Sequence, residues 1–437
     1  MRSLAVLLER DEPLGGLRLQ DLDLRAVEDR LMQRSDLAGL VVLGGTMTPA
    51  LGSHLREHGA IVFPVDPDAP VSCYRAHLYT PAELYAGLDG PGGYAGTPDA
   101  RAYQWSRAAR ASLDAYATLL CAIHDDSVTD ALDEFVAGRR VVGVMGGHAA
   151  ARGSEPYAVA ARLGFELAGA DYLVATGGGP GSMEAANLGA VAPDQAALDA
   201  ALGTLARVPA FTPDTGAWAS LGFEVLGSLG RRSLGPLSLG RLSLGPLSLG
   251  PLSLGPLPLG PLPLGPLSLG RLPAPAPGGG TARARSLGIP TWFYGHEPPN
   301  VFCDGIGKYF SNALREDGLL ARCTAGVVVL EGAAGTVQEV FQASTRLYYA
   351  AEEARLPPLV LVGRRYWSER LPVWQALQAL AAGRGMAGAI HLVDGIDEVL
   401  DVLDVPDVLD VPDVLDALGS AGPAAHPSSR PGAASAR

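Results

Sequence analysis

The sequence predicts an α/β protein. Its main part is a doubly wound, parallel, Rossmann-like sheet, with a small N-terminal α/β unit before it and a disordered low-complexity insertion within it. Two observations predict the sheet. Short apolar runs alternate with helical stretches, which is typical of parallel strands covered on both faces by helices. Two glycine-rich turns each follow an apolar run and open a helix, as turns do where such sheets bind ligands.

Composition limits the function classes. The 437 residues suffice for two or three domains, and 33 basic against 46 acidic residues give a net charge of −13. This charge argues against a general nucleic-acid surface and against an acidic membrane. The N-terminal apolar stretch is too short for a signal peptide, and no apolar run of about 18 residues appears. We therefore expect a cytoplasmic protein that binds no nucleic-acid polymer and no membrane.

The four cysteines and the histidines form no metal-binding motif. No CxxC pair occurs, so neither a zinc knuckle nor a disulfide framework is indicated, and we expect reduced thiols. No His-Glu-x-x-His pattern is present either. We expect neither a metal ion nor a cofactor.

Residues 1–137 predict the small N-terminal unit. Apolar runs at 40–43 and 60–63 are expected strands, and 49–58 between them is an expected helix. The stretch 100–137, rich in Ala, Leu and Arg at helical spacing, predicts one long helix that leads into the next domain.

Residues 138–222 and 286–400 together predict the main domain. Its expected strands are 141–145, 172–175, 289–294, 327–330, 359–362 and 390–393. Its expected helices are 155–169, 182–190, 305–317, 336–351 and 371–382. Ligands of such folds bind outside the carboxyl ends of the strands.

Two biased segments stand apart from these domains. Within 223–285 a Ser-Leu-Gly-Pro-Leu unit repeats, and its Gly and Pro residues break both helix and strand. A solenoid is one interpretation, but five residues are too few for known stacked repeats, so we expect a disordered insertion. Residues 401–437 hold an Asp/Val/Pro repeat that can extend the last helix by a turn, followed by an expected disordered tail.

The turn at 331–339 is the most specific motif. Small residues there let an anion approach the backbone at a helix N-terminus; they are Gly332, Ala333, Ala334 and Gly335. Thr336 can donate a hydrogen bond to a phosphate oxygen, and Glu339 can bind ribose hydroxyls and stabilise positive charge on a ribosyl carbon. A capping box, with Thr336 as N-cap and Glu339 reaching back, explains the same spacing equally well. Glu331 adds negative charge that a phosphate role leaves unexplained.

The turn at 177–184 is a weaker signal. Its glycines, Gly178, Gly179 and Gly181, are expected to line the same mouth as Gly146 and Gly147, and Glu184 is a possible site carboxylate. The GxGxG spacing lacks the acidic residue of a dinucleotide site, and no Walker lysine follows. A tight strand-to-helix turn explains the glycines as well, and the helix dipole alone favours Glu184.

Other polar residues lie near the expected strand ends. Arg315 can bind a phosphate through its fork of donors, although a surface salt bridge explains it too. His148 is a possible base contact, but a histidine in a turn is more often solvated. Lys308 and Asn312 are expected to share a helix face near the polar segment 294–300.

At its two turns together the sequence resembles the LONELY GUY (LOG) family. The matching motifs are Gly177-Gly-Gly-Pro-Gly-Ser-Met183 and Glu331-Gly-Ala-Ala-Gly-Thr-Val-Gln-Glu339, and the likeness covers about 138–400 without the insertion. The family's Pro-Gly-Gly is replaced by Glu331-Gly332-Ala333, which places an acid near the expected phosphate.

The resemblance implies a phosphoribohydrolase that cleaves a nucleoside 5′-monophosphate to a free base and ribose 5-phosphate. It implies that Glu339 and Arg315 are catalytic, that 332–336 bind the phosphate, and that the protein is a homo-oligomer. The residues that it places on the base and ribose side are Gly146, Gly147, Gly178, Gly179, Gly181, Met183 and Glu184. A nucleotide-binding or sensing protein without turnover is the alternative. A dinucleotide oxidoreductase lacks its full fingerprint.

Overall fold

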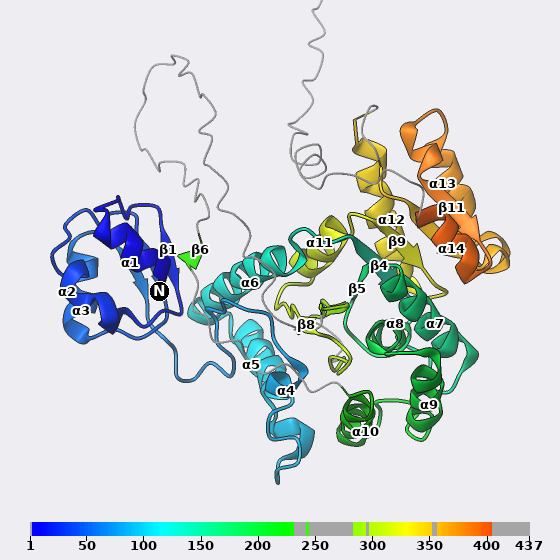
Figure 1. Ribbon diagram of the computed structural model, residues 1–437, viewed down its shortest axis with the longest axis horizontal. Coiled ribbons are helices and arrows are strands. Elements are labelled where there is room, and N and C mark those ends of the chain that lie inside the picture. The colour runs from blue at the N-terminus through cyan, green and yellow to red at the C-terminus, as the bar shows by residue number, and fades with distance from the viewer. Residues whose placement is uncertain (1, 231–241, 244–282, 294–296, 352–355, 404–437) are drawn as a thin grey trace, which may run out of the picture. The chain divides into compact units, whose positions relative to one another are not determined.

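The structure, a computed structural model, describes residues 2–230, 242–243, 283–293, 297–351 and 356–403. They form two compact units (Figure 1). Unit 1 contains the described residues up to Val65 together with 242–243 and 283–284. Unit 2 contains those from Asp66 to Gly230 and from Arg285 to Leu403.

Unit 1 is a small α/β unit, as expected. Its elements are α1 (Arg2–Glu9), β1 (Arg18–Gln20), η1 (Leu24–Val27), α2 (Glu28–Leu31), β2 (Val41–Leu43), α3 (Pro49–Glu57), β3 (Ile61–Phe63) and β6 (Leu242–Ser243). The sheet order is β3-β2-β1-β6, with β6 antiparallel to β1 and the other pairs parallel. Buried leucines of the strands and helices, among them Leu19, Leu51 and Leu55, form its core. The expected strands at 40–43 and 60–63 and the helix at 49–58 are confirmed as β2, β3 and α3.

Unit 2 is built on a seven-stranded sheet in which every pair of neighbours is parallel. Its strands are β4 (Val141–Met145), β5 (Leu173–Thr176), β7 (Ser286–Gly288), β8 (Gly305–Ile306), β9 (Gly326–Val329), β10 (Leu359–Val362) and β11 (Ile390–Val393). The order is β11-β10-β9-β4-β5-β7-β8. From β4 the chain first adds strands on one side and then, from β9, on the other. The reversal between β4 and β9 is a topological switch point, where such sheets bind ligands. The predicted fold class is confirmed.

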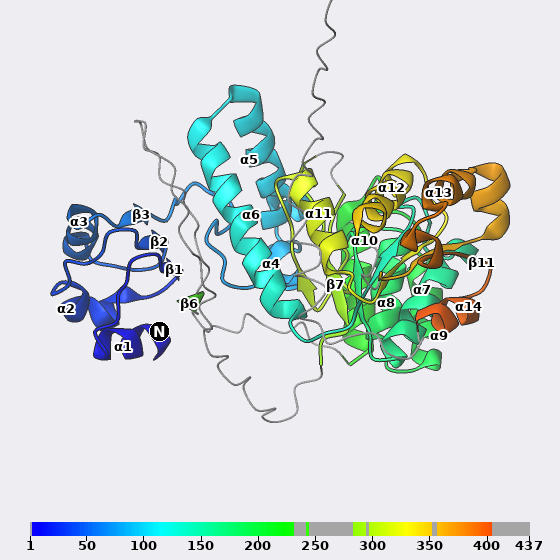
Figure 2. The same ribbon diagram turned by 90° about the horizontal axis from the view of Figure 1, so that it is seen from above.

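Helices flank this sheet (Figures 1 and 2). They are α4 (Pro81–Leu84), α5 (Pro98–Ser112), α6 (Ala115–Val136), α7 (Glu155–Gly169), α8 (Ser182–Val191), α9 (Gln195–Leu205), α10 (Thr215–Ser228), α11 (Asn312–Arg322), α12 (Ala334–Tyr349), α13 (Val373–Ala381) and α14 (Ile396–Leu403). Short non-α turns are η2 (Gly93–Gly96), η3 (Tyr366–Arg370) and η4 (Gly385–Gly388). α7 and α8 pack so closely that Gly189 lies against the backbone of Ala161. A side chain at Gly189 would force the two helices apart.

Three expected elements differ from the structure. The helix at 100–137 is two helices, because Leu113 is left-handed (φ 53°) and Asp114 caps the start of α6; the pair forms a hairpin (Figure 2). No strand forms at the described residues of 289–294; β7 lies just before them, and Pro290 has no N–H for a strand ladder. The helix at 305–317 begins only at Asn312, and its first residues form β8.

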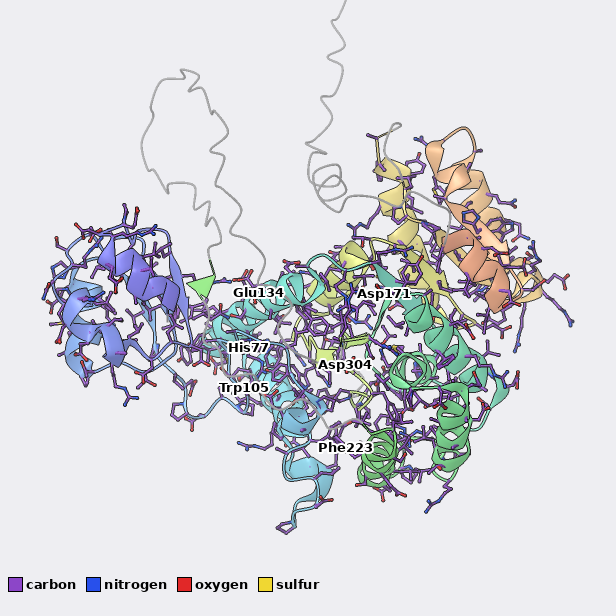
Figure 3. All side chains as sticks on the ribbon, viewed as in Figure 1. His77, Trp105, Glu134, Asp171, Phe223 and Asp304 are labelled. Atoms are coloured by element: carbon purple, nitrogen blue, oxygen red, sulfur yellow. The ribbon has the colours of Figure 1, made fainter. Side chains whose placement is uncertain are left out.

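The boundary of the N-terminal unit lies at Val65, not at residue 137. The segment after Val65 packs onto the rest of unit 2 through aromatic contacts. The ring of Trp105 lies 5.7 Å from that of Phe310, and the ring of Tyr85 lies 5.6 Å from that of Phe223. Figure 3 labels Trp105 of this segment and Phe223 of α10. Helices α5 and α6 therefore belong to the same core as the seven-stranded sheet.

The low-complexity segments fall partly inside the structure. Residues 223–228 of the expected insertion form the end of α10, and 401–403 form the end of α14, a helix that was not predicted from the sequence. The predictions of disorder for 231–241, 244–282 and 404–437 lie outside the described residues. All four cysteines are free thiols. In the described ranges, every helix is too short or too polar to cross a bilayer.

Candidate functional site

Three turns meet beside the switch point, one after each of the neighbouring strands β5, β4 and β9. Gly147, after β4, joins the other two through its backbone. Its N–H donates to the carbonyl of Glu331 (3.2 Å), and its carbonyl accepts from the N–H of Ser182 (3.1 Å). A methyl group on Gly146 would lie 2.8 Å from the Cβ of Ser182. The glycines at 146–147 thus bring the two glycine-rich turns of the sequence into contact.

The turn after β9 presents an open helix N-terminus. α12 starts after Ala333, and no side chain caps it. Hydroxyl or carboxylate side chains cap most other helices of unit 2; these caps are Thr80, Thr97, Asp114, Ser154, Asp194, Asp214 and Ser311. Ala333, Ala334 and Gly335 are exposed. Backbone N–H groups at such a terminus have no intrahelical partner and attract an anion.

Thr336 and Glu339 do not form the capping box that their spacing allows. Thr336 is the third residue of α12, and its buried hydroxyl lies against Gly332, where a methyl group would overlap it. Tyr366, the first residue of η3 after β10, fixes this turn, because its hydroxyl donates to the carbonyl of Gly332 (2.6 Å). The carboxylate of Glu331 points toward Gly363, which follows β10. Its Oε1 lies 3.5 Å from the position that a Cβ on Gly363 would occupy.

Arg315 and Glu339 form an ion pair between the two turns. Nη1 of Arg315 donates to Oε1 of Glu339 at 3.2 Å, and the two side chains are 11% and 13% exposed. Nε of Arg315 donates to the carbonyl of Ile289 (2.8 Å), and its guanidinium touches Gly177, where a methyl group would overlap it. Burial raises the pKa of Glu339, and the charge of Arg315 opposes that rise. The two predicted catalytic residues are therefore brought together.

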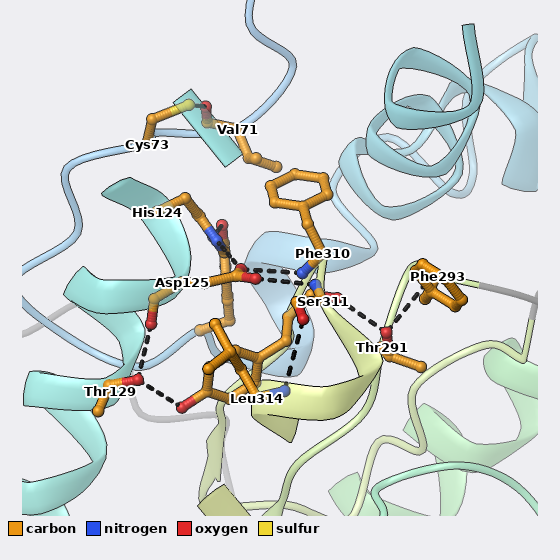
Figure 4. Close-up of polar contacts among 12 residues, drawn as sticks. Val71, Cys73, His124, Asp125, Thr129, Thr291, Phe293, Phe310, Ser311 and Leu314 are labelled. Carbon is orange, nitrogen blue, oxygen red and sulfur yellow. Dashed lines mark hydrogen bonds and ion pairs between the residues drawn. The ribbon is translucent and has the colours of Figure 1, made fainter. Parts of the chain in front are cut away.

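A buried carboxylate from α6 fixes the start of the helix that carries Arg315 (Figure 4). Asp125 accepts hydrogen bonds from the N–H groups of Phe310 (2.9 Å) and Ser311 (2.8 Å), just before α11. His124 contacts the same carboxylate through Nδ1 (3.0 Å) and Tyr79 through Nε2 (2.8 Å). Burial lowers the pKa of His124, so its ring is held neutral.

The turn after β5 is buried throughout. Gly178 and Gly181 have positive φ (70° and 74°), which favours glycine. Hydrogen bonds within the protein fix this turn: Thr176 accepts from the N–H of Gly178 (2.9 Å), and Asn300 donates to the carbonyl of Gly179 (3.2 Å). Asn187 of α8 joins Thr176 (2.7 Å) to Asn300 (2.9 Å).

Two residues of α8 that were predicted to line the ligand, Met183 and Glu184, lie in different places. Met183 packs over Gly177 and Gly179, next to the guanidinium of Arg315, so it lies at the site. Glu184 does not. Its carboxylate is completely buried and forms a two-pronged ion pair with Arg152, away from the mouth. The prediction that Glu184 lines the ligand is therefore wrong.

His148 and Glu297 form a second pair of opposite charge type at the exposed edge of the site, which we call the rim. Nδ1 of His148 lies 3.4 Å from Oε1 of Glu297, and the side chains are 60% and 38% exposed. Lys308 does not share a helix face with Asn312, because it precedes α11. It is fully buried, with Nζ 2.7 Å from Oδ1 of Asp99.

Several residues that fix the site were missed from the sequence. Asp99 and Asp125 lie in a segment assigned to another domain, and no local pattern links them to the main sheet. Asn187 has a signal, since it is an amide in a helix of small apolar residues. Within the described residues, no group of three or more His, Cys, Asp or Glu side chains could hold a metal ion.

Comparison with known proteins adds no relative. No protein-family model matches the chain, and no curated protein matches it significantly.

Proposed function

We propose that this protein is a nucleotide phosphoribohydrolase that acts on nucleoside 5′-monophosphates. The observation that carries the proposal is the largely buried Arg315–Glu339 pair, whose carboxylate belongs to the same helix as the uncapped N-terminus of α12. The helix end suits a phosphate, and a carboxylate on the same helix suits the ribose. The resemblance of both turns to the LOG family supports the same assignment.

In the proposed reaction the bond between C1′ and the base nitrogen breaks, and its electron pair leaves with the base. The ribose then carries oxocarbenium character, which the carboxylate of Glu339 stabilises. A water molecule adds its oxygen to C1′ and gives up a proton, and the base takes up a proton. The products are ribose 5-phosphate and the free base.

Within this scheme Arg315 orients Glu339. Its guanidinium is fixed at one end by the carbonyl of Ile289 and contacts Gly177, so it holds the carboxylate in one place. It also supplies positive charge close to the phosphate end of the site. The uncapped turn at 332–336 then binds the phosphate through backbone N–H groups.

The test is turnover by the purified full-length chain. We expect AMP, GMP, IMP or CMP to release ribose 5-phosphate, measured as a reducing sugar, with the base measured by chromatography. Glu339→Gln should lower kcat/KM about 10²- to 10³-fold, with nucleotide affinity retained. Asp317→Asn, an exposed carboxylate on the same α11 as Arg315, is the matched control and should leave turnover unchanged.

A nucleotide-binding protein without turnover is the second candidate. Glu331 and Ala333, in place of the proline and glycine of the family motif, favour it. Tight nucleotide binding by the wild-type chain with no ribose 5-phosphate would establish this candidate and contradict the enzyme. Full turnover by Glu339→Gln would remove Glu339 from the mechanism.

A further inference from the structure

The rim of the site carries a carboxylate that the proposed reaction does not use. Oε2 of Glu297 lies over the first glycine turn, 2.9 Å from the position of a Cβ on Gly179. The guanidinium of Arg315 covers Gly177 of the same turn, two residues before. Two residues of chain span at most about 7 Å, a length comparable with the distance from a ribose to the far edge of its base.

Met183 lies between these two groups. Its Sδ is 2.7 Å from the position of a Cβ on Gly177, and its Cε is 3.1 Å from that on Gly179. Met183 is only 8% exposed, so its apolar and polarisable thioether fills the space between the two groups. The turn thus runs from the Arg315–Glu339 pair, past an apolar side chain, to Glu297 and His148.

Glu297 is held in place through its main chain. Its carbonyl accepts from Nζ of Lys308 (3.4 Å), which is fully buried and paired with Asp99 of α5. The hydroxyl of Tyr85 donates to the carbonyl of Pro299 (2.6 Å), and the N–H of Asn300 donates to Gly178 (2.8 Å). The side chain of Glu297 is 38% exposed, so its oxygens remain accessible to a ligand.

An ionised carboxylate only accepts hydrogen bonds, and it binds best to two adjacent N–H donors. Guanine presents such a pair on its pairing edge, at N1 and the 2-amino group. Adenine and cytosine present one amino group beside an acceptor nitrogen, which a carboxylate repels. His148 lies next to Glu297 and can donate to the neighbouring O6 of guanine.

Given the proposed function, the geometry points to Glu297 as the residue that selects the base, and to guanine nucleotides as the preferred substrates. Phosphate binds at the N-terminus of α12, ribose lies at Arg315 and Glu339, and the base lies along the exposed edge of the site with its pairing edge on Glu297.

The test compares GMP with IMP, which lacks only the 2-amino group, on the full-length chain. Both kcat/KM and Kd, the latter by calorimetry, are measured. We expect GMP to be preferred about 10- to 100-fold. Glu297→Gln should reduce that preference to about threefold or less, because an amide replaces one acceptor with a donor. Glu224→Gln, an exposed carboxylate on α10, should leave it unchanged.

Each outcome decides a specific point. Equal use of GMP and IMP by the wild-type chain, or an unchanged preference in Glu297→Gln, overturns the role of Glu297. A Glu297-dependent preference in binding without any cleavage supports that role and overturns the proposed enzyme. A chain that neither binds nor cleaves either nucleotide overturns both. A circular dichroism melt of each variant verifies that it is folded.

Discussion

The two glycine-rich turns have similar sequences and opposite environments. The turn after β5 is buried, and its helix uses the carbonyl of Gly147 to accept from Ser182. The turn after β9 is exposed at Ala333, Ala334 and Gly335, and no side chain caps its helix. In the first turn the glycines allow close packing of the backbone, and in the second turn the small residues leave the backbone accessible.

The carboxylates that follow the turns differ in the same way. Glu184 is fully buried against Arg152, so it has no access to a ligand. Glu339 pairs with Arg315 at the mouth of the site and keeps 13% of its side chain exposed. The two carboxylates therefore differ in access: Glu184 is neutralised inside the protein, and Glu339 keeps partial exposure at the candidate site.

The sharpest test of this contrast exchanges one glycine in each turn for alanine. Gly181 has φ 74° and ψ −135°, and a methyl group there would lie 2.5 Å from the carbonyl oxygen of Gly147. We expect Gly181→Ala to lower the free energy of unfolding by about 3 kcal/mol or more. A methyl group on Gly335 meets no atom within 4 Å, so Gly335→Ala should be neutral or stabilising by up to about 1 kcal/mol.

Urea denaturation of both variants measures these changes. A destabilisation by Gly335→Ala as large as that by Gly181→Ala would show that both turns are packed alike. That result would contradict the difference in packing between the two turns.

The pH dependence of turnover tests the second turn. Burial raises the pKa of Glu339 above its ordinary 4.5, with Arg315 opposing. Since the ionised carboxylate stabilises the transition state, kcat/KM should fall tenfold per pH unit below that raised pKa. Arg315→Met removes the charge that favours ionisation, so the midpoint should move to higher pH.

Ribose 5-phosphate release between pH 4 and 8 gives the midpoint. The Asp317→Asn variant should keep the wild-type profile. A midpoint below pH 4.5 would contradict a raised pKa of Glu339. A midpoint that is the same in Arg315→Met as in the wild type would contradict the effect of Arg315 on that pKa.

The smallest expected effect concerns Glu331. Its carboxylate is turned toward Gly363, yet it is exposed and next to the proposed phosphate site. Removing an exposed charge of the wrong sign should strengthen binding only modestly, by about two- to fivefold in Kd. Titration of Glu331→Gln with GMP at low and high salt checks this, because the gain should shrink as salt rises. A gain that salt does not alter would mean that Glu331 acts through the shape of the turn.

Much of the fold could be predicted because strand signals are local. The strands at 141–145, 359–362 and 390–393 match the structure at both ends, since each is a short apolar run between turns. The prediction failed where a single residue decided the backbone. Pro290 has no N–H for a strand ladder, and β7 lies just before the strand expected at 289–294. Left-handed Leu113 with the capping Asp114 divides the expected long helix.

The candidate site was predicted in part. Arg315, Glu339 and the turn at 332–336 lie together, and Met183 lies beside them. The carboxylate of Glu184 was misassigned, because its partner Arg152 lies in a distant loop and no sequence pattern predicts that the two residues pair. The contribution of α5 and α6 was missed for the same reason, since Asp99 and Asp125 reach the site only through tertiary packing.

The sequence by itself determined the strands, the glycine turns and the residue types available at the strand ends, because these depend on neighbours along the chain. Only the tertiary structure decided which turn is open and which is buried. It also decided which carboxylate faces the site and which is neutralised inside the protein. A charged side chain is buried or exposed according to the segments that pack on it, and those segments are distant in the sequence.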